Sequence, residues 1–253
     1  MWRKVIQMLM NENRIDLNCP YPQTYCAILT HKPENLSFAK KHYGDRDNRL
    51  YLSDTNVEGT MNIHQEGYDS RVFGEIPAWM WLADKIREQD WVSLNAYRRK
   101  LKLGIGTLVA QPLQWGCSVL DQLANYHSPI YCDVLHTILP PNEFNLLQRN
   151  VFFPYNIAQM SGQHIKHYVS FIKEREDAFF KCLGFVPTVD NCRKFVTSEQ
   201  SILEQTIPDK NVNVEYQARI GAFIAERLNT IYWQLVGNFV PTEVMLLEPN
   251  QHI

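Results

Sequence analysis

The chain has 253 residues, of which 45% are apolar and 21% are charged, and its formal net charge is −2. This is an ordinary globular composition, and the length suffices for one large domain or two small ones. A net charge so close to zero excludes a global field that draws the protein to nucleic acid or to anionic lipid. Any polyanionic partner must therefore be met by a local basic patch.

The six cysteines form no C-x-x-C pair, and no secretion signal opens the chain. Reduced thiols in a cytoplasmic protein are the simplest interpretation. The apolar run near the start is too short to span a bilayer, so we expect no insertion into a membrane. The sequence leaves the oligomeric state open.

The first half of the chain alternates strands and helices. Residues 24–31 form an apolar, β-rich run, 33–43 a short helix and 49–53 a second strand; a loop through Gly59, Asn62 and Gly67 follows. Residues 70–90 carry one apolar helical stripe, with Pro77 marking a start or a kink. Residues 91–96 form the next strand. Strand, helix and strand at this spacing predict a βαβ unit and a mostly parallel central sheet.

The second half is mainly helical. We expect a strand over 106–115, two helices over 117–127 and 130–139 that are separated at Ser128–Pro129, and a strand over 156–160. A long helix over 163–184 should end at Gly184. Residues 185–213 read as loop with a short helix, 214–237 as the most periodic helix and 242–247 as a last strand. The prediction is one α/β domain over 1–253, with a nucleotide-binding half at about 20–115 and a helical half at about 116–253.

Four short segments follow one another in a recognisable order. They are THKP after the first strand, VSLNAYRRKL after the tryptophan-rich helix, FFPYNIAQMSG before the long helix, and YQARIGAFIAERL near the end. This order resembles the glycosyltransferases first described as a domain of unknown function in capsular and exopolysaccharide loci. The resemblance covers the chain from about Tyr25 to Tyr232. It implies a nucleotide-sugar (GT-A-like) fold, in which ligands bind at the carboxyl ends of the strands.

The resemblance also implies a binding site for the sugar donor. The residues predicted to bind the donor are Thr30, His31, Lys32, Asn62, Glu75, Tyr97, Arg98, Arg99, Tyr155 and Asn156. The residues THKP would lie against the nucleoside, with hydrogen bonds from Thr30 and His31 and with Lys32 facing a phosphate.

The paired arginines Arg98 and Arg99 end a strand where many enzymes of this fold place an Asp-x-Asp motif that holds a divalent metal. Arginine keeps its charge and matches phosphate oxygens with a planar fork, so it can neutralise the leaving group without metal. Because side chains alternate along a strand, we expect one arginine to face the site. An ion pair with Glu75, or simple solvation, is the alternative. Asp45 and Asp47 form the one Asp-x-Asp and read as a surface turn rather than a metal site.

The remaining site residues belong to catalysis and to the acceptor. Glu226, His127 and Asp133 are the candidate catalytic residues, because transfer needs a base near the anomeric carbon. Glu226 alternatively forms a half-buried ion pair with Arg227, and His127 alternatively ends a helix. The predicted acceptor-binding residues are Lys100, Lys102, Tyr216 and Arg219.

The predicted activity is transfer of a sugar from a UDP-sugar to an acceptor hydroxyl, with no metal cofactor. Short members of the resembled family are similar to tailed-phage enzymes that glycosylate hydroxymethylcytosine in DNA, some with arabinose, and the basic cluster favours this acceptor. Such a protein would act in the host cytoplasm. Trp79, Trp81, Trp91 and Trp115 could stack on a flipped base or simply pack in the core. A polysaccharide acceptor is the alternative.

A second alternative is an inactive binding module. It rests on Ala96 and Ala225, which stand where the resembled family has a histidine and a serine. The sequence fixes neither the sugar nor the anomeric outcome, inverting or retaining.

Overall fold

The computed structural model describes residues 19–44, 46, 48–102, 104–110, 116–151, 154–206 and 213–247. Asp45, Asp47 and Trp115 lie outside the described residues, as do residues 111–115 of the strand predicted over 106–115. The predictions made for those residues are therefore not tested by the structure.

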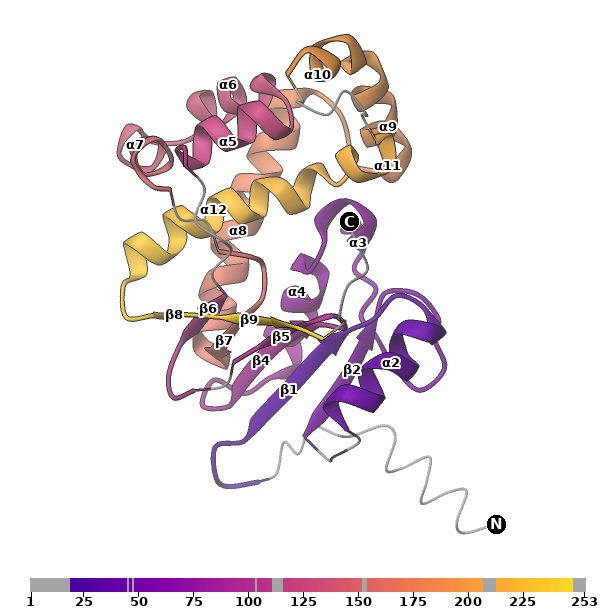
Figure 1. Ribbon diagram of the computed structural model, residues 1–253. Coiled ribbons are helices and arrows are strands. Elements are labelled where there is room, and N and C mark those ends of the chain that lie inside the picture. Colours follow the sequence, from indigo (N-terminus) through magenta and orange to yellow (C-terminus); the bar gives the residue numbers. More distant parts are fainter. Residues whose placement is uncertain are drawn as a thin grey trace.

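A single mixed sheet organises the described chain (Figure 1). Its strands are β1 (Thr24–Leu29), β2 (Arg49–Ser53), β3 (Met61–Asn62), β4 (Trp91–Ala96), β5 (Arg99–Leu101), β6 (Leu108–Ala110), β7 (Ala158–Ser161), β8 (Val240–Thr242) and β9 (Val244–Leu246). The order is β3-β2-β1-β4-β7-β6-β8, with β5 and β9 continuing beside β4. The strands β3, β2, β1 and β4 are mutually parallel, whereas β5 and β7 run antiparallel to β4. The predicted α/β class with a mostly parallel central sheet is confirmed.

The helices are α2 (Pro33–Tyr43), α3 (Ser70–Phe73), α4 (Ile76–Lys85), α5 (Val119–Tyr126), α6 (Pro129–Ile138), α7 (Pro141–Arg149), α8 (Gly162–Leu183), α9 (Val189–Ser198), α10 (Gln200–Thr206), α11 (Val214–Gln217) and α12 (Ile220–Val236). Helix α2 lies beside β1 and β2, while α5, α6, α7, α9, α10 and α11 gather beyond the other end of the sheet (Figure 1). Helix α8 runs from this group down beside the sheet to β7, and α12 runs from it toward β8 (Figure 1). The predicted helical C-terminal half is confirmed.

The two faces of the sheet support two separate cores because side chains alternate along β1. Cys26 and Ile28 pack with α2 residues in a small cluster. Tyr25, Ala27 and Leu29 point to the opposite face and join a large cluster that includes Trp79. The sheet is thus covered on both faces, and its strand ends are left to form surface sites.

Several predicted elements differ from the observed ones. The helix predicted over 70–90 is two helices, because Gly74 has a φ of 59° and ends α3. The helix predicted over 214–237 is broken in the same way, since Arg219 adopts a non-helical conformation between α11 and α12. Residues 185–213, read as loop with a short helix, contain α9 and α10, and α7 was not predicted at all.

In the described part of the chain, no helix combines the length and the apolarity that crossing a bilayer requires.

Candidate functional site

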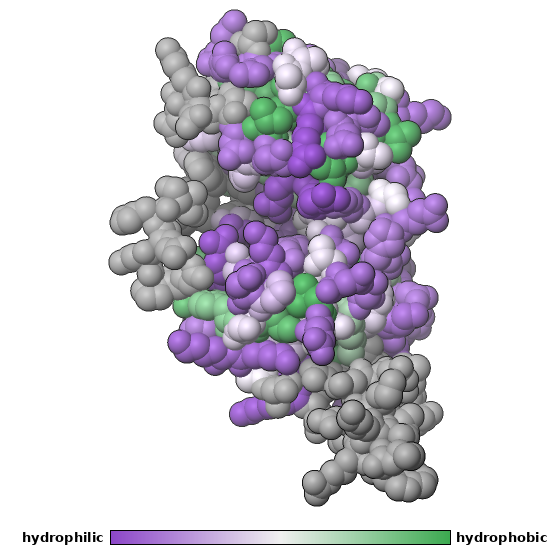
Figure 2. Space-filling view, turned by 90° about the vertical axis from the view of Figure 1, so that its right-hand side faces the viewer, coloured by the Kyte–Doolittle hydropathy of each residue, from purple (hydrophilic) through white to green (hydrophobic). Residues whose placement is uncertain are grey.

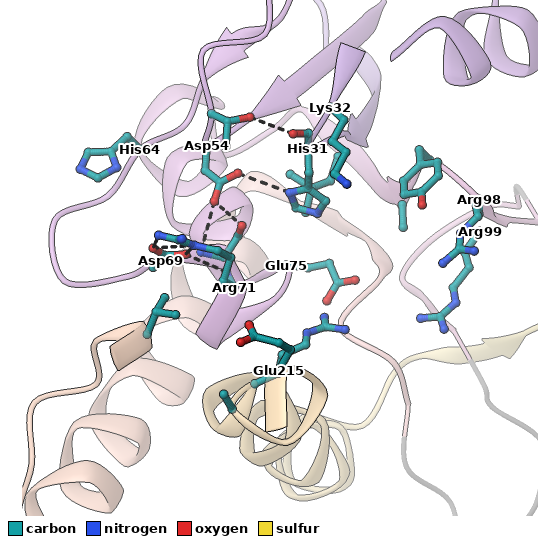
Figure 3. Close-up of a pocket in the computed structure, with 18 residues that line it drawn as sticks. His31, Lys32, Asp54, His64, Asp69, Arg71, Glu75, Arg98, Arg99 and Glu215 are labelled. Atoms are coloured by element: carbon teal, nitrogen blue, oxygen red, sulfur yellow. Dashed lines mark hydrogen bonds and ion pairs between the residues drawn. The ribbon is translucent and has the colours of Figure 1, made fainter. Parts of the chain in front are cut away.

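A pocket of about 760 Å³ opens at the carboxyl ends of the parallel strands. The residues that line it come from the segments that follow β1, β2 and β3, from the turn between β4 and β5, and from α3 and the start of α4. The first residue of α9, helix α11 and the segment that joins α11 to α12 complete the lining. The lining residues are Leu29, His31, Lys32, Asp54, Thr55, His64, Asp69, Ser70, Arg71, Glu75, Ala96, Tyr97, Arg98, Arg99, Val189, Glu215, Ala218 and Arg219. Figure 3 shows these residues converging on one space.

One wall of the pocket is a hydrogen-bonded network of residues that follow β1 and β2 in the chain, together with Ser70 of α3. His31 Nδ1 lies 3.3 Å from Asp54 Oδ1, and the hydroxyl of Ser70 donates to the other carboxylate oxygen of Asp54. Thr55 Oγ1 donates to the His31 carbonyl at 3.0 Å. Burial raises the pKa of the Asp54 carboxyl, but the hydrogen bonds from His31 and Ser70 outweigh burial and lower that pKa to about 2. This wall therefore holds a fixed carboxylate at neutral pH.

The opposite wall is basic and lies on the tight turn between β4 and β5. Ala96 pairs with Arg99, so Tyr97 and Arg98 form the turn and Arg99 begins the return strand. Both arginines line the pocket, which corrects the expectation that only one would face it. Strand alternation does not apply here because the chain has already turned.

The turn is held from below by Tyr43, the last residue of α2. Its hydroxyl lies 3.2 Å from the carbonyl oxygens of both Ala96 and Arg99. The guanidinium of Arg99 in turn sits 4.8 Å from the centre of the Tyr155 ring, a cation–π distance. Both contacts fix the direction in which Arg99 points.

The third wall brings Glu75 and Arg219 together from distant parts of the chain. If Gly74 carried a Cβ, that atom would lie 3.4 Å from Arg219 Nη2 and 3.0 Å from the Ala222 side chain. The glycine therefore lets the start of α12 pack directly on the junction of α3 and α4. Arg219 precedes the first turn of α12, where backbone N–H groups and the helix dipole favour anions.

Four cationic side chains of the pocket have no anionic partner among the residues that the structure describes. In the described chain, no carboxylate forms an ion pair with Lys32, Arg98, Arg99 or Arg219. Within the described chain, Glu75 forms no ion pair with Arg98 or Arg99, so the alternative considered above is not observed. In contrast, Arg71 is held by Asp69 at 2.6 Å and Glu215 by Arg193 at 2.7 Å. The arrangement can bind an anion that carries more than one negative charge.

Seven predicted site residues line the pocket, namely His31, Lys32, Glu75, Tyr97, Arg98, Arg99 and Arg219. Others do not. Thr30 is completely buried and its hydroxyl donates to the Leu52 carbonyl. Asn62 is exposed and accepts a hydrogen bond from the His64 backbone. Asn156 is buried and bonds to Asn229 and to the carbonyl of Ala222.

The three predicted catalytic residues also lie outside the pocket lining. His127 is 4% exposed, stacks on Phe223 at 3.8 Å, and has a pKa lowered to about 3, chiefly by burial. Asp133 is exposed on α6. Glu226 is paired with the buried Arg227 at 3.0 Å.

Of the predicted acceptor residues, only Arg219 lines the pocket. Lys100 Nζ lies 5.2 Å from the Tyr43 ring centre, on the α2 side of the sheet, and Lys102 lies 3.8 Å from Glu243 on the surface. Tyr216 is half exposed and packs on Phe223, one residue beyond the pocket wall at Glu215. Tyr155 contacts Arg99 from behind.

Sequence reasoning missed Asp54, Thr55, Asp69, Ser70 and Arg71. Asp54 directly follows the predicted strand 49–53, so the rule that selected His31 and Arg98 would have selected it too. Among the described residues, no group of three or more histidines, cysteines or acidic residues has a geometry suited to a metal ion.

The sequence matches no protein-family model, and no curated protein matches it. Among solved structures, the chain is similar to the apo structure of a bifunctional glycosyltransferase, WbbM, with a TM-score of 0.48 and 13% sequence identity over 90% of this chain. The chain spans 46% of that solved chain, or about half its length.

Proposed function

We propose that this protein is a glycosyltransferase that binds a UDP-sugar in the pocket at the carboxyl ends of β1, β2 and β4. The proposal rests mainly on one observation: four cationic side chains, Lys32, Arg98, Arg99 and Arg219, line the same pocket. None of them pairs with a carboxylate in the described part of the chain. A diphosphate has the charge and the oxygen geometry that such a cluster favours. The order of motifs in the sequence supports a nucleotide-sugar fold independently.

Two of the three walls of the pocket suit the two parts of such a donor. The His31, Asp54 and Ser70 network offers a fixed carboxylate and a histidine to a nucleoside. The arginine wall faces the diphosphate and stabilises the charge that develops there as the bond to the sugar breaks. Because the hydrogen-bonding wall and the cationic wall are separate, the donor can bind in one orientation, with its nucleoside at the first wall and its diphosphate at the second.

We further propose that the reaction requires no divalent metal, because the cationic side chains already supply the charge that a metal would. Turnover should persist after dialysis against a chelator and should not rise when manganese or magnesium is restored. Activity that disappears in chelator and returns with manganese would refute this part of the proposal.

For the acceptor, we propose 5-hydroxymethylcytosine in DNA, with a polysaccharide as the alternative. The support is the sequence resemblance together with the basic turn and strand from Arg98 to Lys102 beside the pocket. Trp79 is not available to stack on a flipped base, because it is fully buried and its indole N–H donates to the Asn156 carbonyl at 2.7 Å. It is a core residue.

The first test is a panel of nucleotides and nucleotide sugars in a thermal-shift assay, since a ligand that binds only the native state raises the melting temperature. We expect UDP and UDP-sugars to stabilise the protein more than adenine or guanine counterparts. Release of UDP from UDP-glucose, UDP-galactose or UDP-arabinose then separates an enzyme from an inactive module, which would bind these ligands without turnover. No stabilisation by any nucleotide would refute donor binding.

A further inference from the structure

We propose that Glu75, rather than Glu226, is the catalytic base that takes the proton from the acceptor hydroxyl. This inference rests on the glycosyltransferase function proposed above. The sequence motifs predicted that Glu75 binds the donor, and the inference gives it a catalytic role instead. Three observations support it: where the carboxylate stands, what its neighbours do, and how Glu226 is held.

Glu75 lies on the third wall of the pocket, between the Asp54 network and the arginine turn (Figure 3). It directly precedes α4 without forming a side-chain capping hydrogen bond, and it follows Gly74, whose φ of 59° turns the chain. Because Arg219 packs on Gly74, the carboxylate of Glu75 is brought to the cationic side of the pocket. Figure 3 shows Glu75 between the Asp54 network and the Arg98–Arg99 turn. A sugar that bridges a diphosphate and an acceptor would lie in this region.

Among the described acidic side chains that line the pocket, Glu75 is the one without a hydrogen-bond or ion-pair partner. Asp54 is held by His31 and Ser70, Asp69 by Arg71, and Glu215 by Arg193. Described residues form neither a hydrogen bond nor an ion pair with the Glu75 carboxylate. A base must have an oxygen available to the proton that it abstracts, and Glu75 meets this condition without breaking an existing bond.

Glu226 is constrained in the opposite way. Its carboxylate contacts Arg227 at 3.0 Å, and Arg227 is itself 1% exposed and held by Gln122 and the Phe223 carbonyl. Burial raises the pKa of Glu226, the positive charge of Arg227 opposes that rise, and the negative charge of Glu75 adds to it. Glu226 is therefore close enough to sense Glu75, but it lies behind the pocket lining. It serves to hold Arg227 and the first turns of α12 in place.

The reaction then balances as follows. Glu75 accepts the proton of the acceptor hydroxyl, and the oxygen forms a bond to the anomeric carbon. The bond between that carbon and the diphosphate oxygen breaks, and its electron pair leaves with UDP, whose charge faces Arg98, Arg99 and Arg219. Glu75 afterwards returns its proton to solvent. No oxidant, reductant or further reactant is needed.

The test compares Glu75→Gln and Glu75→Asp with Glu226→Gln. A charge-loss control is Glu88→Gln, which removes an exposed acid paired with Lys166 on the surface. Each protein is assayed for UDP release and for sugar transfer to duplexes containing 5-hydroxymethylcytosine, with water as the acceptor in parallel reactions. The affinity for UDP is measured by calorimetry, and the melting temperature reports folding.

We expect Glu75→Gln to lower kcat by about 10²- to 10⁴-fold, the usual contribution of a general base. Its affinity for UDP should be unchanged or higher, because a negative charge near the phosphates has been removed. Glu75→Asp, which keeps a carboxylate on a shorter side chain, should recover part of the rate. Glu88→Gln should match the wild type.

Each other outcome overturns the inference in a distinct way. Near-native turnover of Glu75→Gln, or a larger fall of kcat in Glu226→Gln than in Glu75→Gln, assigns the base elsewhere. Weaker binding of UDP-sugar with unchanged binding of UDP in Glu75→Gln would assign Glu75 to the donor sugar. If the wild type binds UDP but turns over no donor, the proposed function fails first and this inference with it.

Discussion

The two arginines at the end of β4 are adjacent in sequence but occupy different environments. Arg98 is exposed, with its guanidinium 5.2 Å from the Tyr97 ring centre, while Arg99 is half buried over Tyr155. A less exposed charge is screened less by water and salt, so Arg99 should contribute more to stabilising a leaving diphosphate. The difference can be measured because neither residue forms a described ion pair.

We therefore predict that Arg99→Ala loses about 2–4 kcal/mol of transition-state stabilisation, on the scale of a lost oxyanion donor, and that Arg98→Ala loses less. The melting temperature should change little, since neither side chain lies in the core. Arg99→Lys should recover only part of the rate, because lysine keeps the charge without the planar fork. Steady-state kinetics decide the matter, and equal, near-native rates for both alanine variants would contradict the phosphate role.

Glu176 is a second residue whose behaviour follows from its surroundings. It is 0% exposed on α8, and neither carboxylate oxygen has a hydrogen-bond partner in the described structure. Burial raises the pKa of Glu176 far above its usual range, with a smaller upward contribution from Asp177 and an opposing one from Lys173. A negative charge on Glu176 would in turn raise the pKa of Tyr68 and of Tyr168. The folded protein therefore holds Glu176 protonated.

This predicts a stability that falls as pH rises. The unfolded chain releases the proton near pH 4.5, whereas the folded chain retains it, so stability is full below that pH and is lost on the way to the folded-state pKa. The loss is about 1.4 kcal/mol for each pH unit over which the two states differ by one proton. In urea titrations, Glu176→Gln should equal the wild type at pH 4 and exceed it at pH 8. A constant difference between the two proteins at all pH values would show that Glu176 does not carry the proton.

The position of Arg219 depends on a close contact between two helices. A Cβ on Gly221 of α12 would overlap the ring of Phe73 at the end of α3, lying 2.8 Å from its Cε1. Phe73 cannot yield, because it is 1% exposed and packs against Tyr68 and Phe180. The absence of a side chain at Gly221 is what lets α12 deliver Arg219 to the pocket.

Gly221→Ala should consequently cost about 1–3 kcal/mol of unfolding free energy, as overpacked cores do. It should also weaken UDP binding, because α12 must move away from Gly74. Gly116→Ala is the matched control, since a Cβ at Gly116 meets nothing within 4 Å. Chemical denaturation and calorimetry report the two effects. If Gly221→Ala is destabilised but binds UDP with unchanged affinity, the contact between α12 and α3 does not control the position of Arg219.

The elements that sequence patterns predicted well are those with strong local signals. The long helix over 163–184 was placed almost to the residue, because Ser161 caps its start and Gly184 adopts a left-handed conformation at its end. Over residues 185–213 the sequence predicts loop with one short helix where the structure has two, α9 and α10, because both helices are short and mostly polar. Their few buried positions, such as Cys192 and Val196, become meaningful only against a core that the sequence does not display.

At the scale of the whole molecule, one rule accounts for five of the 18 residues that line the pocket, namely His31, Lys32, Tyr97, Arg98 and Arg99. The carboxyl ends of parallel strands share one edge of the sheet, so residues after β1 and β4 could be brought together from sequence alone. The contributions of α3 and α9, and the identity of the free carboxylate, depend on how α12 crosses the α3–α4 junction. That crossing is decided by contacts between residues about 150 positions apart.

The surface charge of the molecule bears on the acceptor. Hydrophilic residues cover most of the face in Figure 2, and hydrophobic ones form only small separate patches. With a net charge of −2, a DNA-binding footprint must be small and local. Lys100 on β5 and Lys102 just after it are suitable probes of such a footprint, because both lie near the Arg98–Arg99 turn but neither lines the pocket.

We predict that Lys100→Glu combined with Lys102→Glu weakens binding to duplex DNA while leaving the affinity for UDP unchanged. Each lost phosphate contact should lower the slope of log affinity against log salt by about 0.9. Lys166→Glu with Lys173→Glu on α8 makes the same change of charge at exposed positions outside the pocket lining and serves as the control. Fluorescence anisotropy at several salt concentrations measures binding, and labelled UDP-sugars measure transfer to duplexes with and without 5-hydroxymethylcytosine. Unmodified cytosine must be inert, because the exocyclic hydroxyl is the nucleophile. An equal loss in the control pair, or no transfer to modified DNA from any common UDP-sugar, would favour a polysaccharide acceptor instead.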